Sequence, residues 1–291
     1  MSAPVPSGLV VVKLGGRTQD DARLPGALAR AWRATGGRLV VVHGGGDQVS
    51  ALQRARGVAP AFVGGRRVTT AADVDDLRMA LSGAANKRLV AALQRAGVPA
   101  FGVSGEDGAC IAAAPTADPR LGEVGELGRA PARVDARALT LLLGAGYCPV
   151  VSPVSASAGE PGRALNVNGD DAAAAVAAAL AAAELLFVAD VPGVLAGGAD
   201  GAAGAALGTL DARGARALVA AGVAAGGMAA KLEAAFAALA AGVARVRVGD
   251  AAMLGDPSAG TAVVAGGGTA AAGAAVGDAV AGSAGVAPAA A

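Results

Sequence analysis

Two short aliphatic runs, each ending in glycines, constrain the fold more than any other feature of this sequence. Residues 9–16 read LVVVKLGG, and residues 39–46 repeat the pattern as LVVVHGGG. Four aliphatic residues in a row are typical of a strand that is buried on both faces, as in a parallel sheet. The glycines leave backbone N–H groups accessible at the carboxyl end, where open α/β sheets bind their ligands. We therefore expect two neighbouring strands whose ends line one anion-binding crevice.

The segment between the two runs has the pattern of a helix. Leu24, Leu28, Ala31 and Trp32 recur at helical spacing, and two glycines end the pattern before the second run. A strand, a helix and a second strand in this order require the two strands to be parallel. The sequence therefore predicts a βαβ unit at the start of an α/β fold.

The composition excludes two classes of partner. The 291 residues are 54% hydrophobic and 16% charged with a net charge of +1, which lacks the basic excess of a nucleic-acid-binding protein. The longest apolar run, residues 172–183, is shorter than the roughly 20 residues that a membrane span needs. Residues 1–7 lack the regions of an export signal, and Cys110 and Cys148 lack metal-binding spacing. We expect a cytoplasmic protein that binds neither nucleic acid nor membranes.

The basic residues are strongly biased in type. Arginine outnumbers lysine 21 to 3. This bias indicates mutational pressure towards GC-rich codons, under which a lysine persists where a planar guanidinium cannot replace its compact ammonium. Lys13, Lys87 and Lys231 are therefore candidate functional residues.

Three groups of polar residues allow either a structural or a functional interpretation. His43 is the only histidine, and a lone histidine is more often structural than catalytic. Arg66 and Arg67 lie close to the bend of a predicted hairpin over residues 61–70, where charged pairs usually protect a solvated edge. Residues 166–171 (NVNGDD) crowd the start of a helix, where capping accounts for one polar side chain but not for four.

The sequence lacks the common nucleotide-binding fingerprints. Neither GxxxxGK[ST] nor a strand followed by GxGxxG occurs, which argues against a P-loop NTPase and a Rossmann-type oxidoreductase. Glycine-rich tips, isolated lysines and an Asn/Asp cluster instead favour phosphoryl transfer, which depends on positioning and charge stabilisation. No base for a hydroxyl acceptor stands out, whereas a carboxylate is already ionised at pH 7 and attacks unaided. The pattern therefore favours formation of an acyl phosphate.

Eight short motifs in order resemble those of the amino acid kinase family and, within it, of the N-acetyl-L-glutamate kinases. The resemblance covers residues 9–264. Each motif alone is weakly specific, but the eight in order are strongly specific. They are KLGG beginning at Lys13, HGGG at His43, GGRRVT ending at Thr69, NK at Asn86, SGEDG at Ser104, NVNGD at Asn166, DVPGVL at Asp190 and GGMAAK ending at Lys231.

The resemblance implies an open three-layer αβα sandwich with a mainly parallel central sheet and two lobes. Residues 1–182 would form an N-terminal lobe that binds the acyl amino acid and dimerises, and residues 183–268 a C-terminal lobe that binds ATP. Residues 269–291 are expected to form a disordered Gly/Ala tail. The implied activity is ATP-dependent phosphorylation of the side-chain carboxylate of N-acetyl-L-glutamate to N-acetyl-L-glutamyl 5-phosphate, the second step of arginine biosynthesis.

The resemblance also implies roles for individual residues. Lys13 would stabilise the transferring phosphoryl group, Lys231 would meet the nucleotide phosphates, and Asp170 would orient both lysines. Mg²⁺ would arrive with ATP rather than in a protein cage. The residues that would hold the acyl amino acid are Gly44, Gly45, Arg67 and Asn166. The nucleotide-binding residues would be Lys13, Gly15, Gly16, Ala189, Asp190, Gly227 and Lys231. The backbone N–H donors to the phosphoryl group would be those of Gly15, Gly16, Gly44 and Gly45.

One departure from the family pattern leaves the substrate open. Gly169 stands where the acetylglutamate enzymes usually have alanine, and a Gly-Asp pair there is similar to the kinase that acts on carrier-protein-bound aminoadipate. N-succinylglutamate is a further alternative, because the pocket shape sets the acyl group. An alternative of another class is a non-catalytic nucleotide or amino-acid sensor on the same fold. Such a sensor would not need transition-state groups such as Lys13, Asp170 and Lys231.

The N-terminus bears on assembly and regulation. Arginine-inhibited members of this family carry an N-terminal helix that links dimers into a hexamer and completes the arginine site. Here residues 1–8 (MSAPVPSG) precede the first strand and contain two prolines, so the sequence predicts no helix there. We therefore expect a homodimer through the N-terminal lobe that L-arginine does not inhibit.

Overall fold

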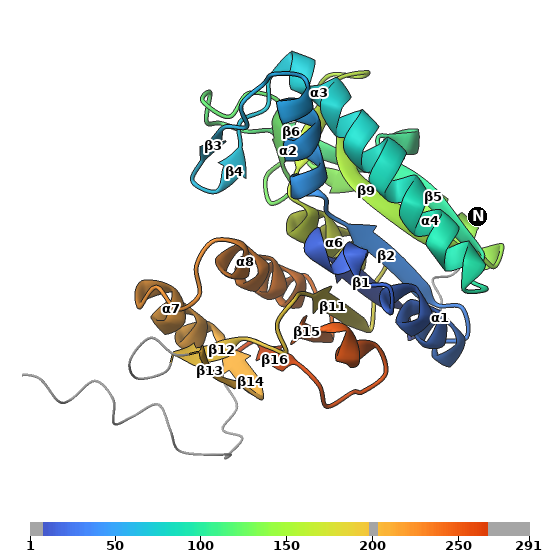
Figure 1. Cartoon of the computed structure of the whole chain (residues 1–291), viewed down its shortest axis with the longest axis vertical. Coiled ribbons are helices and arrows are strands. Elements are labelled where there is room, and N and C mark those ends of the chain that lie inside the picture. The colour runs from blue at the N-terminus through green and yellow to red at the C-terminus, as the bar shows by residue number, and fades with distance from the viewer. Residues whose placement is uncertain (1–7, 198–202, 267–291) are drawn as a thin grey trace, which may run out of the picture.

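The computed structural model describes residues 8–197 and 203–266 (Figure 1). The expectations for residues 1–7 and for the tail over 269–291 lie outside the described residues. Within the described ranges, no helix has both the length and the apolar character needed to cross a membrane.

The two aliphatic runs form adjacent parallel strands at the centre of the sheet. Strand β1 (Val10–Leu14) pairs with β2 (Leu39–His43), and helix α1 (Leu24–Ala34) connects them. Strand β11 (Glu184–Val188) pairs in parallel with the other side of β1. The predicted βαβ unit is confirmed, and β1 joins the two halves of the chain.

The main sheet contains twelve strands within the described residues, in the order β14-β16-β15-β11-β1-β2-β9-β10-β7-β6-β8, with β5 paired to β9. Most neighbouring strands are parallel, and the antiparallel pairs lie towards the two ends of the sheet. The remaining strands of this sheet are β5 (Ala100–Gly105), β6 (Ile111–Pro115), β7 (Val124–Glu126), β8 (Arg133–Val134), β9 (Cys148–Ser157), β10 (Ala164–Val167), β14 (Thr209–Asp211), β15 (Arg245–Gly249) and β16 (Thr261–Val264).

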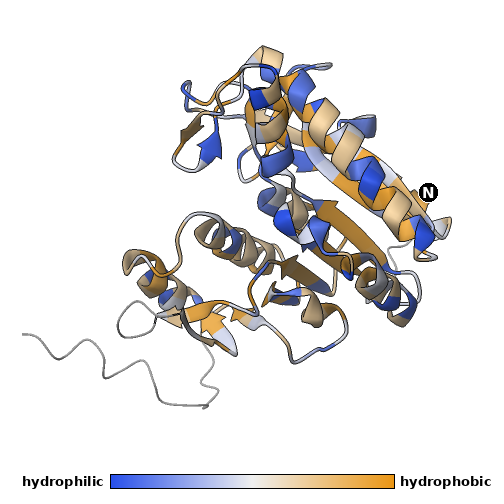
Figure 2. Ribbon diagram, in the orientation of Figure 1, coloured by the Kyte–Doolittle hydropathy of each residue, from blue (hydrophilic) through white to orange (hydrophobic). Residues whose placement is uncertain are grey.

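Helices cover both faces of this sheet. Apolar side chains of β1 alternate between the two faces, because Val11 packs in the cluster of α6 and α8 and Val12 packs in the cluster of α1 and α4. Figure 2 shows apolar strands between helices whose outer faces are more hydrophilic. The αβα sandwich with a mainly parallel sheet is therefore confirmed. The other helices are α2 (Gly46–Ala55), α3 (Ala71–Leu77), α4 (Asn86–Arg95), α5 (Arg137–Gly144), α6 (Gly169–Ala179), α7 (Ala212–Ala220) and α8 (Gly227–Ala240).

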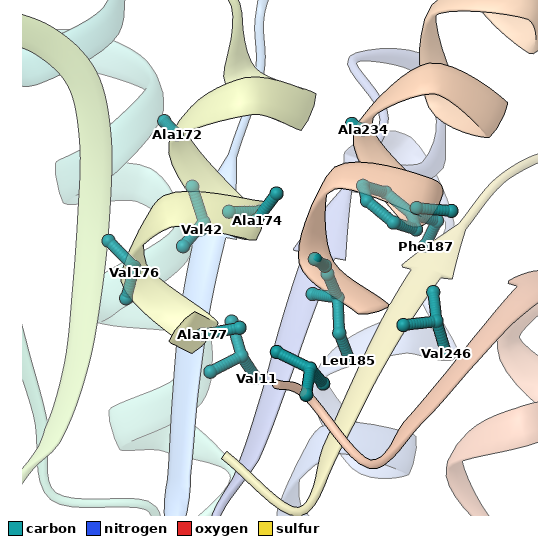
Figure 3. Packing of buried hydrophobic residues seen from close by; sticks show 14 of the residues in the cluster. Val11, Val42, Ala172, Ala174, Val176, Ala177, Leu185, Phe187, Ala234 and Val246 are labelled. Carbon is teal, nitrogen blue, oxygen red and sulfur yellow. The ribbon is translucent and has the colours of Figure 1, made fainter. Parts of the chain in front are cut away.

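The alanine-rich helix α6 lies against the centre of the sheet. Its residues Ala172 and Ala177 are fully buried beside Val11 and Val42, as Figure 3 shows. Small side chains allow the helix backbone to approach the strands closely, and large residues such as Phe187 fill the space under α8. Since Lys13 follows Val11 by two residues on the same face, this packing directs Lys13 towards the start of α6.

A short hairpin and a long helical segment flank the ends of β1 and β2. Strands β3 (Phe62–Val63) and β4 (Arg66–Arg67) form the predicted hairpin. The helical spacing of apolar residues over 73–96 predicts a single helix, but the structure has α3, a π-helical segment η2 (Arg78–Ala85) and α4 in succession. A π-helical stretch of this length is rare and shifts the side chains around the helix axis.

The sequence pattern predicts a hairpin over residues 121–127, a Gly/Ala loop over 197–208 and an edge strand over 260–264. The structure differs at each for reasons of tertiary structure. Residues 121–127 do not form a hairpin of their own, because β7 pairs with β6 and β10. Residues 197–208 include a strand, β13 (Ala203–Ala206), which pairs with β12 (Leu195–Gly197) although alanine and glycine have low strand propensity. Strand β16 is not the sheet edge, since β14 pairs with it on the outer side.

Candidate functional site

The carboxyl ends of β1 and β2 open into a cavity of about 260 Å³. The hairpin, the start of α2, the π-helical segment and the start of α6 provide its other walls. Of the residues singled out from the sequence, those that line this cavity are Lys13, Gly16, Gly44, Gly45, Arg66, Arg67, Asn166, Asn168, Gly169 and Asp170. The predicted crevice between two strand ends is therefore present in the structure.

Asp170 lies between two lysines from different halves of the chain. Its Oδ1 is 2.7 Å from Nζ of Lys13 on β1, and its Oδ2 is 3.5 Å from Nζ of Lys231 on α8. All three side chains are mostly buried, with 7%, 13% and 7% exposed for Lys13, Lys231 and Asp170. Lys231 also donates to the carbonyl of Gly227 at 3.3 Å, which places Gly227 beside the pair. Asp170 thus holds two ammonium groups together, as the resemblance implied.

The burial of this group alters the charge balance at Lys13. Desolvation lowers the pKa of the Lys13 ammonium, and the positive charge of Lys231 adds to this effect. The carboxylate of Asp170 opposes it by favouring the charged form. Two buried ammonium groups contact one carboxylate, an arrangement suited to binding an anionic ligand.

Two of the four expected glycine donors are already occupied. Gly15 N–H donates to Val188 O at 3.1 Å, and Gly44 N–H donates to Leu14 O at 3.0 Å. These bonds extend the parallel ladders of β1 beyond the last paired residues of each strand. Contrary to the expectation, the N–H groups of Gly15 and Gly44 are therefore not available to a phosphoryl group in this structure. Gly44 still lines the cavity, whereas Gly15 does not.

The other two glycine donors are unoccupied. Within the described residues, the backbone N–H groups of Gly16 and Gly45 donate to no protein acceptor. The two glycines lie side by side, because a Cβ at Gly16 would come within 3.7 Å of Gly45 Cα. Gly45 has a φ of +154°, and a Cβ there would lie 2.5 Å from Leu81 Cδ2. Glycine is therefore required at position 45.

Arg67 projects from the hairpin and is fixed by α2. Its Nη1 donates to Gln53 Oε1 at 2.6 Å, and its Nη2 donates to Gly46 O at 2.8 Å and Ser50 Oγ at 2.7 Å. Its guanidinium also lies over the ring of Phe62, 4.8 Å from the ring centroid. Arg67 is buried rather than solvated, which removes the edge-protection interpretation for this residue.

A series of hydrogen-bonded polar side chains holds Gln53, the partner of Arg67, in place. Gln53 Nε2 donates to Asp73 Oδ1 at 2.7 Å, and Asp73 forms a reciprocal capping box with Thr70 at the start of α3. The orientation of Arg67 thus depends on helices α2 and α3. Nothing in the sequence marked Gln53 as part of this site, because the contact joins residues that are distant in the chain.

The Asn/Asp cluster divides into distinct roles. Asn166 donates to Thr69 Oγ1 at 2.9 Å, which ties β10 to the end of the hairpin segment. Asn168 is the cap of α6, and its Oδ1 accepts from the backbone N–H of Asp170 at 2.7 Å. Asp171 lies 3.9 Å from Arg66, and its negative charge raises the pKa of Lys13. Asn168 also lines the cavity. Asparagine occurs only three times in this sequence, and this rarity was a signal that could have added Asn168 to the site.

Five of the seven predicted nucleotide-binding residues do not line the cavity, namely Gly15, Ala189, Asp190, Gly227 and Lys231. Ala189 and Asp190 follow β11, next to the end of β1, and Ala189 N–H donates to Gly249 O at 2.7 Å. The carboxylate of Asp190 is half exposed and lies 3.4 Å from the exposed guanidinium of Arg17. They lie at the same end of the sheet as Lys13, on the side of the C-terminal half.

His43 is structural. Its ring is fully buried, Nδ1 lies 2.9 Å from Gly44 O, and Nε2 lies 3.1 Å from Asn86 Nδ2. Burial lowers its pKa to about 4, so that the ring is neutral at pH 7. The neutral tautomer with a proton on Nδ1 satisfies both contacts. Lys87 is bonded nearby to Asn86 Oδ1 and Gly102 O, and it does not reach the cavity.

Comparison with known proteins gives a consistent result. Residues 8–250 match the amino acid kinase family. The chain is 42% identical over 248 residues to the acetylglutamate kinase of Chloroflexus aurantiacus, which covers 84% of this chain and 93% of that protein. It is 42% identical over 232 residues to the acetylglutamate kinase of Geobacillus kaustophilus, covering 79% and 85% of the two chains. A crystal structure of a Streptococcus mutans protein has a TM-score of 0.76 and 28% identity, covering 89% of this chain and 99% of that chain. The chain therefore belongs to the amino acid kinase family.

Proposed function

We propose that this protein catalyses the ATP-dependent phosphorylation of the side-chain carboxylate of N-acetyl-L-glutamate, the second step of arginine biosynthesis. The observation that carries the proposal is the carboxylate of Asp170 held between Lys13 and Lys231 at the strand-end cavity. The acetylglutamate kinases that are 42% identical over most of this chain support the same substrate. The product would be N-acetyl-L-glutamyl 5-phosphate.

The proposed mechanism uses positioned charges rather than a general base. The substrate carboxylate is ionised at neutral pH, so it attacks the γ-phosphorus without losing a proton. Lys13 would neutralise the equatorial oxygens of the transferring group together with the N–H groups of Gly16 and Gly45. Lys231 would neutralise charge on the leaving ADP. Such preorganised donors are the main source of catalysis in phosphoryl transfer.

The two lobes are proposed to bind different substrates. Residues 1–182 contain Arg67 and Asn166, which would hold the α-carboxylate and the acyl amide, respectively. Residues 183–268 contain Ala189, Asp190, Gly227 and Lys231, which would hold ATP. In this arrangement Asp170 near the end of the first lobe would hold a lysine from each lobe, so that the pair would be in place before either substrate binds.

ATP would bring Mg²⁺ to the site. Within residues 8–197 and 203–266, no group of three or more His, Cys, Asp or Glu side chains is arranged to hold a metal ion. The donor set fits phosphate rather than a divalent cation, since it consists of two ammonium groups and two N–H groups. Mg²⁺ held by phosphate oxygens would neutralise further charge in the transition state.

The experiment that tests this function compares three acceptors with ATP and Mg²⁺. ADP release is measured with N-acetyl-L-glutamate, N-succinyl-L-glutamate and L-glutamate, with Asp170→Asn as the inactive control. We expect the highest kcat/KM with N-acetyl-L-glutamate. A higher value with the succinyl compound would assign the acyl group differently. Tight ATP binding without turnover on any acceptor would support the alternative of a sensor.

We also propose a homodimer through the N-terminal lobe. Strand β5 pairs only with β9 among the described strands, so its other edge is open for pairing. Phe101 on β5 and Tyr147 are 45% and 41% exposed and form an edge-to-face pair with centroids 5.7 Å apart. Light scattering at micromolar concentration, beside an activity titration with millimolar L-arginine, tests this assembly and the predicted insensitivity to arginine. A monomer, or a hexamer inhibited by arginine, would contradict the expectation.

A further inference from the structure

The side chain of Gln19 bridges the two glycine-rich strand ends. Gln19 lies on the short helix η1 (Arg17–Asp20), directly after the first glycine pair. Its Nε2 donates to the carbonyl of Gly44 at 3.0 Å and to the carbonyl of Gly15 at 3.3 Å. One amide NH₂ group therefore joins β1 to β2 beyond the last paired residues of both strands.

The hydrogen-bond partners fix the orientation of this amide. Both neighbours of Nε2 are carbonyl oxygens, which can only accept. Rotating the amide by half a turn would bring its own oxygen against them. The NH₂ group must therefore face the two strand ends, and each of its two hydrogens has one acceptor.

A second donor holds each of these carbonyls. Thr18 Oγ1 donates to Gly15 O at 2.7 Å, and the Nδ1 proton of His43 is directed to Gly44 O at 2.9 Å. Each carbonyl thus has two donors, and Gln19 is the donor that both share. The orientation of the two peptide units is therefore coupled through one side chain.

The geometry of the peptide unit links these carbonyls to the cavity. Both peptide bonds are trans, so the N–H of Gly16 is antiparallel to the carbonyl of Gly15, and the N–H of Gly45 to that of Gly44. Gly16 and Gly45 line the cavity, whereas Gln19 does not. Because the carbonyls point to Gln19, the two unoccupied N–H groups point the opposite way, towards the cavity.

We propose that Gln19 is a positioning residue that sets the direction of the two backbone donors, Gly16 N–H and Gly45 N–H, towards the transferring phosphoryl group. The inference rests on the proposed kinase function, since it assigns the donors to phosphoryl transfer. Gln19 touches neither substrate and acts through the two peptide units. Its loss leaves each carbonyl with a single donor, from Thr18 or His43, and removes the one donor that couples the two peptides.

The test replaces the amide without changing its size. Gln19→Met removes the donors, and Gln19→Glu turns a carboxylate towards the two carbonyls. We expect kcat with ATP, Mg²⁺ and N-acetyl-L-glutamate to fall roughly tenfold for Gln19→Met and roughly 100-fold for Gln19→Glu, below or at the range for losing a donor outright. Both KM values should stay within about threefold, because the donors act on the transition state. The exposed neighbour variant Asp20→Asn is the matched control and should keep wild-type kcat.

A second measurement separates positioning from a general structural role. The dissociation constant of ADP with aluminium fluoride, measured with N-acetyl-L-glutamate and Mg²⁺, should rise by the same factor as kcat falls, whereas that of ADP alone should not change. The thermal midpoint of Gln19→Met should stay close to that of the wild type. Wild-type kcat in Gln19→Met, or an equal loss of affinity for ADP alone, would overturn the inference. An inactive wild type would instead overturn the proposed function, so the two failures are distinguishable.

Discussion

Asp170 Oδ1 lies 2.7 Å from Lys13 Nζ, although Asp170 lies in the first turn of α6 and Lys13 on the first strand of the chain. The contact forms because Lys13 shares the face of β1 that α6 covers, and because Asn168 caps α6 so that Asp170 occupies its first turn. The same carboxylate lies 3.5 Å from Lys231.

The first prediction concerns the choice of lysine at position 231. Lys231→Arg conserves the charge but cannot place a compact ammonium between Asp170 and Gly227, so kcat should fall roughly 100-fold or more. Lys87→Arg is the matched control, since Lys87 contacts Asn86 and Gly102 outside the cavity. Steady-state kinetics of both variants decide the matter. Equal losses would contradict the separation of the two lysines into catalytic and structural groups.

The second prediction concerns the specificity of Arg67. Three of its five N–H hydrogens are bonded to Gln53, Gly46 and Ser50, which leaves two for a substrate carboxylate. Arg67→Ala should raise KM for N-acetyl-L-glutamate at least tenfold and KM for ATP by less than threefold, the scale of a lost charged contact. The control Arg54→Ala removes a charge from the exposed side of α2. An effect on ATP alone would assign the hairpin to the nucleotide instead.

The third prediction contrasts two glycines at the cavity. A Cβ at Gly169 would meet Lys13 Cε at 3.5 Å and His43 O at 3.6 Å, which are ordinary contacts. Gly169→Ala should therefore keep activity within about threefold and stabilise the start of α6 by ~0.5 kcal/mol. Its kcat/KM and urea unfolding check both effects. A large loss of activity would mean that Lys13 needs the space that Gly169 leaves.

Gly45→Ala is the counterpart at the same cavity. It should lower kcat more than tenfold and destabilise the protein by ~1–3 kcal/mol, because the residue has a φ of +154° and its Cβ would overlap Leu81. The same two measurements apply. Activity and stability equal to the wild type would show that the loop adopts another conformation than the one described.

The fourth prediction concerns the pH dependence of stability through His43. Burial lowers its pKa to about 4 in the folded protein, against about 6.5 in the unfolded chain. As the pH falls through this window, the unfolded state binds the proton first, so ~3 kcal/mol of stability is lost between pH 6.5 and 4. Urea unfolding of the wild type and of His43→Asn at pH 7 and pH 5 measures the difference. A direct check is the single histidine ring resonance, which should not titrate above pH 5.

The sequence by itself determined the centre of the fold. The aliphatic runs predicted β1, β2 and their parallel pairing. A continuous run of aliphatic residues places apolar side chains on both faces of a strand, and both faces are covered in a parallel sheet. The rarity of lysine drew attention to Lys13 and Lys231, and the crowding of four polar residues at one helix start drew attention to the Asn/Asp cluster. These signals are local in the chain, so they were readable without a structure. The eight motifs in order then indicated the amino acid kinase family.

Only the tertiary structure decided which groups act together. Gly15 and Gly44 donate to neighbouring strands while Gly16 and Gly45 do not, a difference set by where each ladder ends. Gln19 and Gln53 carried no signal in the sequence, because a glutamine looks the same whether it is solvated or bonded to a distant residue. The π-helical segment that brings Leu81 to Gly45 likewise depends on packing rather than on periodicity. Contacts between distant segments arise from how the elements pack, and a linear pattern does not contain that information.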